Sequence, residues 1–287
     1  MKKIQYFKLF ESRTAELNKD EFNKILKEKC TNWLANPIYL QRAKNTFDGN
    51  YTYINPKLYI REPFKDEISG VSSKHHSLLM DNLPSWEGFC KRAESIIFIS
   101  KPILTSSFGD YYYYVIPYDN AKFSVAPCMD LWASIADVSS KYESEKYKFD
   151  SLFSEYMVDY NISDSSYVDM ISDLNKAFDD YKESNNAKKF FRVIFDKMIE
   201  DNYSDVGEAL SDYFAPDKFS SRSGEKGFKN MAYDEMSKEL GDSIAYFNTH
   251  KPREVWTDSE CLLVFCDKYT NISILVDKFK EMIESLS

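Results

Sequence analysis

The sequence predicts an α+β fold with a mostly antiparallel sheet core, an N-terminal helix and a helical insertion. Short runs of β-favouring residues alternate with turn clusters over 38–135. Residues 140–215 instead show helical spacing with almost no glycine. A β-type run at 261–265 follows, and we expect it to return to the sheet. The chain has 287 residues without an internal repeat or clear linker, so we expect residues 1–287 to form a single domain with 140–215 as its insertion.

The N-terminal helix is predicted over about residues 12–35. Asn18 is followed three residues later by Glu21, the spacing of a capping box, and Pro37 should end the helix. The apolar positions near helical spacing are Leu17, Phe22, Ile25, Leu26, Trp33 and Leu34.

The predicted strands are short and rich in Tyr, Ile and Phe, and turns with Pro, Asn and Asp separate them. A short helix is expected near Ser73–Met80. The predicted strands are 38–40, 51–54, 58–60, 95–99, 111–116, 121–125 and 261–265.

The remaining helices are predicted from amphipathic spacing, and Ser163-Asp164 is a candidate N-cap for the second of them. The polar segment 217–230 carries two glycines and is predicted to be a loop. These helices are 140–160, 164–184, 187–201, 204–214, 231–241 and 270–286.

Composition limits the class of partner and the compartment. The formal net charge is -9, which disfavours binding to a phosphate backbone and favours a protein substrate, a small molecule or a basic partner. Five cysteines without a CxxC pair argue against a disulfide framework and a structural zinc site. No apolar run has the length of a signal peptide or approaches the about 18 residues of a membrane span. We therefore expect a cytoplasmic protein with no membrane partner.

Several chemistries lack their sequence motifs. The three histidines, His75, His76 and His250, do not have the H-x-x-x-H spacing of zinc hydrolases. No G-x-S-x-G elbow supports a serine hydrolase. Neither a P-loop nor a G-x-G-x-x-G loop is present, so a nucleotide ligand would need Arg, Ser and Tyr side chains instead.

The middle of the chain carries a distinctive series of motifs. Leu83-Pro84-Ser85-Trp86 precedes a basic pair, Lys91-Arg92, and the run Ser95-Ile96-Ile97-Phe98-Ile99-Ser100. Tyr111 to Lys122 and then Asp130-Leu131-Trp132 follow. This series resembles a group of phage proteins and is similar to the NAD-binding half of the ADP-ribosyltransferase fold. The resemblance covers about 38–132 and 250–266, and it implies an ADP-ribosyltransferase-like sheet core.

That family characteristically uses an Arg on an early strand, a Ser-containing strand and a Glu before a late strand. The residues here in the same order are Arg42, Ser100 and Glu254. The resemblance therefore implies an NAD-dependent mono-ADP-ribosyltransferase with these three as catalytic residues. NAD would be the substrate, no metal would be needed, and the acceptor would be a host protein or nucleic acid in the bacterial cytoplasm.

The expected roles agree with the chemistry of NAD. Arg42 offers a charged fork for the phosphates, and Arg61 and Arg92 are further candidates for that contact. Ser100 can orient the carboxylate or the ribose. Glu254 can hold the ribose 2′-hydroxyl and stabilise the positive charge that develops as nicotinamide leaves. Tyr113 is the expected stacking ring.

Each of these residues also has a plainer interpretation. Lys91-Arg92 would be a solvated pair, Ser100 would bond local backbone, and Glu254 would be an exposed loop carboxylate. Ala43 stands where a family glycine commonly follows the Arg, and Pro252 stands where many members carry Glu or Gln. These differences keep two alternatives open. One is a non-catalytic phage protein that inhibits a host or defence factor or sequesters a nucleotide. The other is a structural protein of a phage particle.

Overall fold

The computed structural model describes residues 14–58, 79–102, 109–129, 167–187, 189–219, 227–240, 251–268 and 272–286. It divides into two compact units. The sheet unit consists of Met1–Arg61, Phe89–Leu131 and Phe228–Ser287. The helical unit consists of Glu62–Gly88 and Trp132–Gly227. The predicted helical insertion 140–215 lies entirely within the helical unit.

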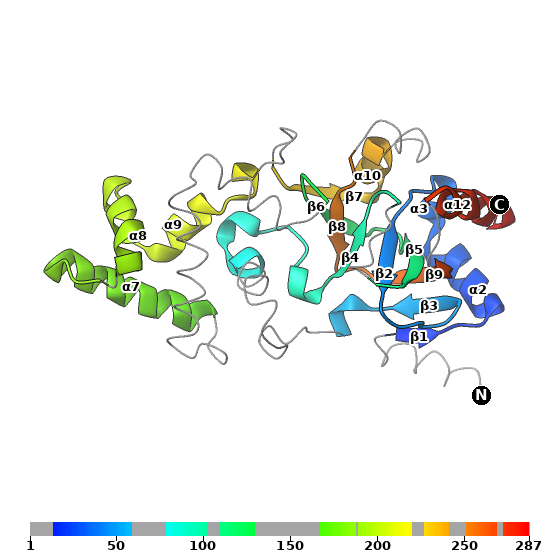
Figure 1. The fold of residues 1–287 in the computed structure, drawn as a ribbon, viewed down its shortest axis with the longest axis horizontal. Helices are drawn as coiled ribbons and strands as arrows, with labels where there is room; N and C mark the ends of the chain where they lie inside the picture. The colour runs from blue at the N-terminus through cyan, green and yellow to red at the C-terminus, as the bar shows by residue number, and fades with distance from the viewer. Residues whose placement is uncertain are drawn as a thin grey trace. The chain divides into compact units, whose positions relative to one another are not determined.

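The sheet unit is built on a nine-stranded sheet with the order β1-β3-β9-β5-β2-β4-β8-β6-β7, and every strand pairing described is antiparallel (Figure 1). The predicted α+β fold with an antiparallel sheet is thus confirmed. The strands are β1 Thr14–Glu16, β2 Gln41–Lys44, β3 Tyr51–Ile54, β4 Ile96–Ile99, β5 Tyr111–Pro117, β6 Lys122–Val125, β7 Lys229–Ala232, β8 Glu254–Thr257 and β9 Cys261–Lys268.

The last strand does return to the sheet, as predicted. β9 is third in the strand order, between β3 and β5. Both β5 and β9 are almost fully buried along their apolar stretches, which explains why their sequences are continuous apolar runs instead of alternating ones.

One joint in the sheet is much weaker than the rest. β2 pairs with β5 along its whole length, from Gln41 to Lys44. Its pairing with β4 is limited to a single position, Gln41 opposite Ile99. We call this joint the β2/β4 seam. It separates a ladder of β1, β3, β9, β5 and β2 from a ladder of β4, β8, β6 and β7.

Four helices accompany the sheet in the described part of this unit: α2 Lys19–Lys29, α3 Thr31–Ala35, α10 Tyr233–Leu240 and α12 Ile272–Leu286. α2 packs on β3, α10 on β6 and β7, and α12 on β9. The Asn18–Glu21 capping box is present at the start of α2 and confirms that prediction.

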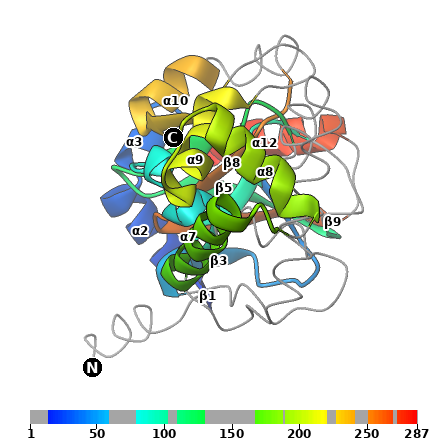
Figure 2. The same cartoon turned by 90° about the vertical axis from the view of Figure 1, so that its left-hand side faces the viewer.

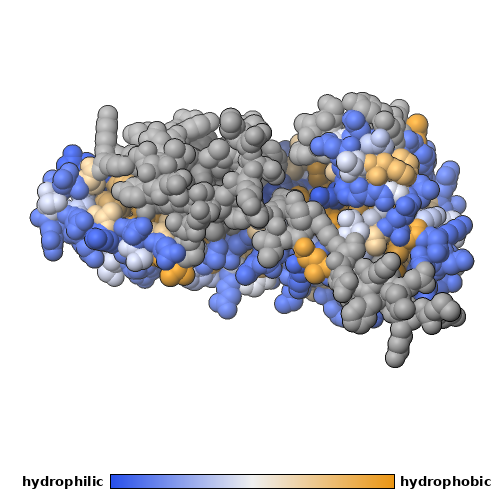
Figure 3. All heavy atoms as spheres, turned by 90° about the horizontal axis from the view of Figure 1, so that it is seen from below, coloured by the Kyte–Doolittle hydropathy of each residue, from blue (hydrophilic) through white to orange (hydrophobic). Residues whose placement is uncertain are grey.

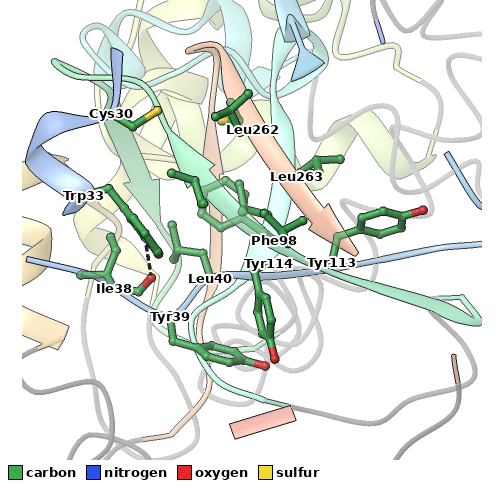
Figure 4. Close-up of a cluster of buried hydrophobic side chains, with 14 of the residues drawn as sticks. Cys30, Trp33, Ile38, Tyr39, Leu40, Phe98, Tyr113, Tyr114, Leu262 and Leu263 are labelled. Atoms are coloured by element: carbon green, nitrogen blue, oxygen red, sulfur yellow. Dashed lines mark hydrogen bonds between the residues drawn. The ribbon is translucent and has the colours of Figure 1, made fainter. Parts of the chain in front are cut away.

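The core of the sheet unit is rich in aromatic rings. Figure 4 shows Trp33 beside Ile38, whose carbonyl oxygen accepts a hydrogen bond of 3.2 Å from the indole nitrogen. Tyr39 and Tyr114 pack edge to face, and both contact Phe279 of α12. Buried aromatic pairs in these geometries stabilise a core beyond their area alone.

The helical unit contains α7 Tyr167–Ser184, α8 Lys189–Glu200 and α9 Val206–Tyr213, which are drawn in green to yellow in Figure 2. The buried face of α7 includes Phe178 and Tyr181, and both rings contact Phe195 of α8. Asp205 caps α9 by accepting a hydrogen bond from the Glu208 amide. Apart from their ends, these three helices match the predicted ones.

Several boundaries in the prediction were wrong. Residues 14–16 form β1, and Cys30 breaks the predicted helix 12–35 into α2 and α3. The strand predicted at 38–40 begins at Gln41, and Leu58 belongs to a 3-10 turn. The predicted loop 217–230 contains the start of β7, because Lys229 and Asn230 pair with β6.

Other predictions fall outside the described residues: the helix at 140–160, the cap Ser163-Asp164 and most of the helix at Ser73–Met80. Among the described helices, none combines the length and the apolar character that crossing a bilayer requires. In Figure 3 the coloured surface is mainly hydrophilic, with scattered hydrophobic side chains. The largest exposed hydrophobic residues described are Phe47, Leu58, Val168, Ile199, Ile272 and Ile274.

Candidate functional site

The three strands that carry Arg42, Ser100 and Glu254 are neighbours in the sheet. Arg42 lies on β2, Ser100 directly follows β4, and Glu254 begins β8; the strand order there is β2-β4-β8. Residues separated by more than 200 positions in the sequence are thus brought to adjacent strands. The site is built around the β2/β4 seam and the end of β8.

Ser100 fixes the backbone next to Glu254. Its amide donates to the Arg253 carbonyl oxygen at 3.0 Å, and its hydroxyl accepts from the Arg253 amide at 3.1 Å. Ser100 is 1% exposed, so its hydroxyl is committed to this local backbone contact. Ser100 therefore acts on Glu254 through the main chain of the preceding residue.

The Glu254 backbone is held from the other side as well. Its amide donates to the Cys128 carbonyl oxygen at 2.7 Å, and its carbonyl oxygen accepts from the Ala126 amide at 2.8 Å. These bonds leave the main chain at Glu254 little freedom. Glu254 is buried in β8, which corrects the interpretation of it as an exposed loop residue.

The Glu254 carboxylate forms an ion pair with Arg92, and the two side chains are 9% and 8% exposed. Arg92 lies in a 3-10 turn just before β4. The solvated pair expected at Lys91-Arg92 is therefore wrong for Arg92, although Lys91 is exposed. A buried ion pair of this kind carries a large desolvation cost, so each charge depends on the other.

A tryptophan supports the arginine. The Arg92 guanidinium carbon lies 5.4 Å from the centre of the Trp256 ring, within the range of a cation–π contact. The Trp256 indole nitrogen donates to the Cys90 carbonyl oxygen at 2.8 Å, and the Cys90 amide donates to the Ser124 hydroxyl at 2.8 Å. Trp256 has no exposed surface. These contacts fix the ring against which Arg92 rests.

A second charge network lies next to Glu254 in the sequence. Arg253 pairs with Glu239 of α10, and Lys229 of β7 donates to both oxygens of that carboxylate, at 2.7 and 2.8 Å. Partial burial by itself would raise the pKa of Glu239. Hydrogen bonds from Lys229 and Arg253 outweigh that effect and hold the pKa below its usual value. This network ties α10 to β7 and to the start of β8.

The Arg42 side chain is not brought to Glu254. Gln41, Ile99 and Glu254 stand opposite one another across β2, β4 and β8. Opposed side chains leave a sheet on one face, and the next residue along a strand leaves on the other face. The register thus directs Arg42 away from Glu254. Its guanidinium donates to the Ile97 carbonyl oxygen at 2.7 Å and so spans the β2/β4 seam.

Tyr113, the predicted stacking ring, is a core residue. Tyr113 has no exposed surface, and its hydroxyl accepts from the Asp48 amide at 2.8 Å; burial raises its pKa to about 12. Its ring belongs to the core of the sheet unit. Arg61 lies outside the described residues.

Three participants were missed from the sequence: Trp256, Arg253 and Glu239. Trp256 lies two residues beyond Glu254, on the same face of β8, so recognising β8 as a strand would have suggested it. Glu239 is contributed by a helix that is distant in the sequence, and no local signal marks it.

The chemical character of the site follows from its side chains. The guanidinium of Arg92 and the carboxylate of Glu254 are buried together, and the Trp256 ring lies beside the guanidinium. Such groups can bind phosphate, ribose hydroxyls and planar cations. Within the described ranges, no group of three or more His, Cys, Asp or Glu side chains is placed to hold a metal ion.

Comparisons of the chain with protein-family models, with curated proteins and with solved structures found no match.

Proposed function

We propose that the protein is an NAD-dependent mono-ADP-ribosyltransferase that modifies a host protein or nucleic acid, with Glu254 as its catalytic carboxylate. The observation that carries the proposal is the buried ion pair of Arg92 and Glu254, at a point of β8 whose main chain Ser100 holds through the Arg253 amide. The order β2-β4-β8 of the strands bearing Arg42, Ser100 and Glu254 also supports an ADP-ribosyltransferase-like fold.

The proposed reaction breaks the bond between the nicotinamide nitrogen and the ribose, and the bonding electrons leave with nicotinamide. Positive charge then develops on the ribose. The Glu254 carboxylate would accept a hydrogen bond from the ribose 2′-hydroxyl and stabilise that charge. An acceptor group attacks the ribose carbon and loses its proton, so ADP-ribose is transferred.

The other residues would bind and position. Arg92 is the guanidinium nearest to Glu254 and is the proposed ligand for the NAD phosphates. Ser100 would be a positioning residue, because it holds the Arg253 amide and so the strand that presents Glu254. Arg42 would maintain the β2/β4 seam through Ile97.

The test is the release of nicotinamide from NAD, measured with and without bacterial lysate, together with transfer of labelled ADP-ribose to lysate components. We expect release by the natural protein and at least a hundredfold loss in Glu254→Gln, of the order found when a key electrostatic group is removed (about 10²–10³). Glu28→Gln is the matched control, because Glu28 is an exposed glutamate on α2. The proposal would be contradicted if no nicotinamide were released under any condition, or if Glu254→Gln and Glu28→Gln released it equally.

A second candidate is a non-catalytic protein that binds a host or defence factor. The observation that favours it is that the Glu254 carboxylate already pairs with Arg92, with only 9% of the side chain exposed. A carboxylate held in this ion pair is not presented to a ligand while the pair persists. This candidate predicts a partner captured equally by the natural protein and by Glu254→Gln, together with no nicotinamide release. A partner lost in Glu254→Gln would count against it.

A further inference from the structure

The ion pair of Arg92 and Glu254 has a consequence for ligand binding. In the proposed reaction Glu254 must face a ribose hydroxyl, and Arg92 must face phosphate. In the structure each of these groups is instead the partner of the other. We therefore expect a ligand that binds phosphate at Arg92 and a ribose hydroxyl at Glu254 to separate the two groups.

We propose that Arg92 is a displaceable partner of Glu254, and that the diphosphate of an incoming nucleotide draws the guanidinium away and so frees the carboxylate. This inference rests on the proposed function and adds a ligand class, the nucleoside diphosphates, together with an order of events. Phosphate and carboxylate compete for the same guanidinium fork, and a diphosphate carries more negative charge than a single carboxylate.

The surroundings of the pair indicate which of its two residues moves when a diphosphate replaces Glu254 as the partner of Arg92. The main chain of Glu254 is held by Ser100 through Arg253 and by Cys128 and Ala126, so the backbone that carries the carboxylate is fixed. Arg92 lies on a short 3-10 turn and has a long side chain. The movable partner is therefore the arginine.

The face of the sheet beside Glu254 is partly open. Ile99 stands opposite Glu254 on β4 and is partly exposed, as is Ile97 two residues earlier on the same strand. Cys128, whose carbonyl oxygen binds the Glu254 amide, is partly exposed too. We expect a ligand to approach the pair along β4, over these partly exposed side chains.

Trp256 provides a reporter for the movement of Arg92. The guanidinium lies over its ring, so displacement changes the electrostatic environment of the indole. Trp33 is a control within the same unit. It is 1% exposed, and its indole binds the Ile38 carbonyl oxygen rather than a charged group.

The experiment labels the full chain with 5-fluorotryptophan and follows its fluorine NMR spectrum during titration with ADP, which has the diphosphate but no nicotinamide to release. Trp256→Phe assigns the Trp256 resonance. We expect that resonance to shift with ADP and with inorganic pyrophosphate, and to shift less with AMP, while the Trp33 resonance stays in place.

Glu254→Gln sharpens the test, because it removes the competitor for Arg92 while leaving the diphosphate contact. We expect ADP to bind this variant about tenfold more tightly than it binds the natural protein, equivalent to about 1.4 kcal/mol. Calorimetry measures the affinity, and Glu28→Gln should leave it unchanged.

Different results would overturn the displacement of Arg92 and the transferase proposal. Binding of ADP with a stationary Trp256 resonance overturns the displacement of Arg92 but leaves the transferase proposal intact. Absence of ADP binding at millimolar concentration also overturns the displacement, and nicotinamide release then decides the transferase proposal separately. Weaker ADP binding by a folded Glu254→Gln variant would show that the two groups cooperate and would likewise refute the competition.

Discussion

Individual side chains at the site depend strongly on their partners, and Arg92 with Glu254 is the clearest case. Both side chains are buried, and Arg92 rests on the fully buried Trp256 ring. Replacing an entire buried pair with apolar residues is often neutral for stability, whereas removing one partner leaves an uncompensated charge. The pair is therefore poorly explained by stability alone, which agrees with a role in binding.

Arg92→Met should lower the free energy of unfolding by about 3–5 kcal/mol, because Glu254 remains buried without its cation. The double variant Arg92→Met/Glu254→Leu should recover most of that loss. Urea unfolding of the two variants and the natural protein measures the difference. Equal losses in the single and the double variant would show that the charge on Glu254 is not the cause.

The ionised Glu239 carboxylate should make the stability of the protein depend on pH. Its pKa is lowered in the folded protein, since the hydrogen bonds from Lys229 and Arg253 outweigh burial. A lowered carboxyl pKa contributes stability that is fully present above the unfolded value, about 4.3, and is lost as the pH falls through the folded value.

Glu239→Gln should therefore reduce the free energy of unfolding at pH 7 by about 1.5–3 kcal/mol, the range for a hydrogen bond to a charged group. The difference from the natural protein should shrink as the pH falls below about 4. Urea unfolding over pH 3 to 7 tests both points. A difference that is independent of pH would mean that the ionised carboxylate is not responsible.

The backbone conformation of Asn120 should also affect the stability of the protein. It lies in the turn between β5 and β6 with a φ of 64°, in the left-handed region. Asn tolerates this region better than most residues, and Gly adopts it freely. Asn120→Ala should cost about 1 kcal/mol, while Asn120→Gly should cost little. Thermal unfolding of the pair distinguishes backbone strain from loss of the side chain, since in the latter case both variants lose equally.

At the scale of elements, the β2/β4 seam is the feature on which the site depends. Only Gln41 and Ile99 pair across it, and the Arg42 guanidinium adds a contact to the Ile97 carbonyl oxygen. A joint with so little main-chain pairing should open more readily than the long β5–β9 ladder.

Arg42→Met should make the amides of β4 exchange faster with deuterium in the unliganded protein, while those of β5 and β9 remain slow. Lys44→Met is the matched control on the same strand; its ammonium pairs with Asp48 rather than crossing the seam. Unchanged exchange in β4 after Arg42→Met would show that Arg42 does not maintain the seam.

The sequence predicted the long elements well, because their signals are local. β5 is a continuous apolar run, α2 has a capping box, and α12 has clear amphipathic spacing. It missed β1, β7 and β8, which have three or four residues each and are stabilised by pairing with distant strands. No local periodicity can develop over so few positions.

The same reasoning explains the outcome at the site. Ser100 and Glu254 were expected together, and the pairing of β4 with β8 brings their backbones together through Arg253. The pairing of Arg92 with Glu254 was not expected, because it depends on how a 3-10 turn before β4 folds over β8. The direction of Arg42 follows from strand register, which the sequence did not determine.

At the scale of the whole molecule, the chain consists of a sheet unit and a helical unit. Glu254, Arg92, Ser100 and Trp256 all belong to the sheet unit. The proposed chemistry therefore needs only that unit. The helical unit contributes none of these four residues and has its own aromatic contacts between α7 and α8.

The most direct measurement is a crystal structure of Glu254→Gln with NAD bound, because this variant should bind the substrate without consuming it. The account predicts the NAD diphosphate within hydrogen-bond distance of Arg92, and the nicotinamide ribose beside residue 254. It is contradicted if NAD binds elsewhere on the chain, or if saturating NAD leaves Arg92 in place against residue 254.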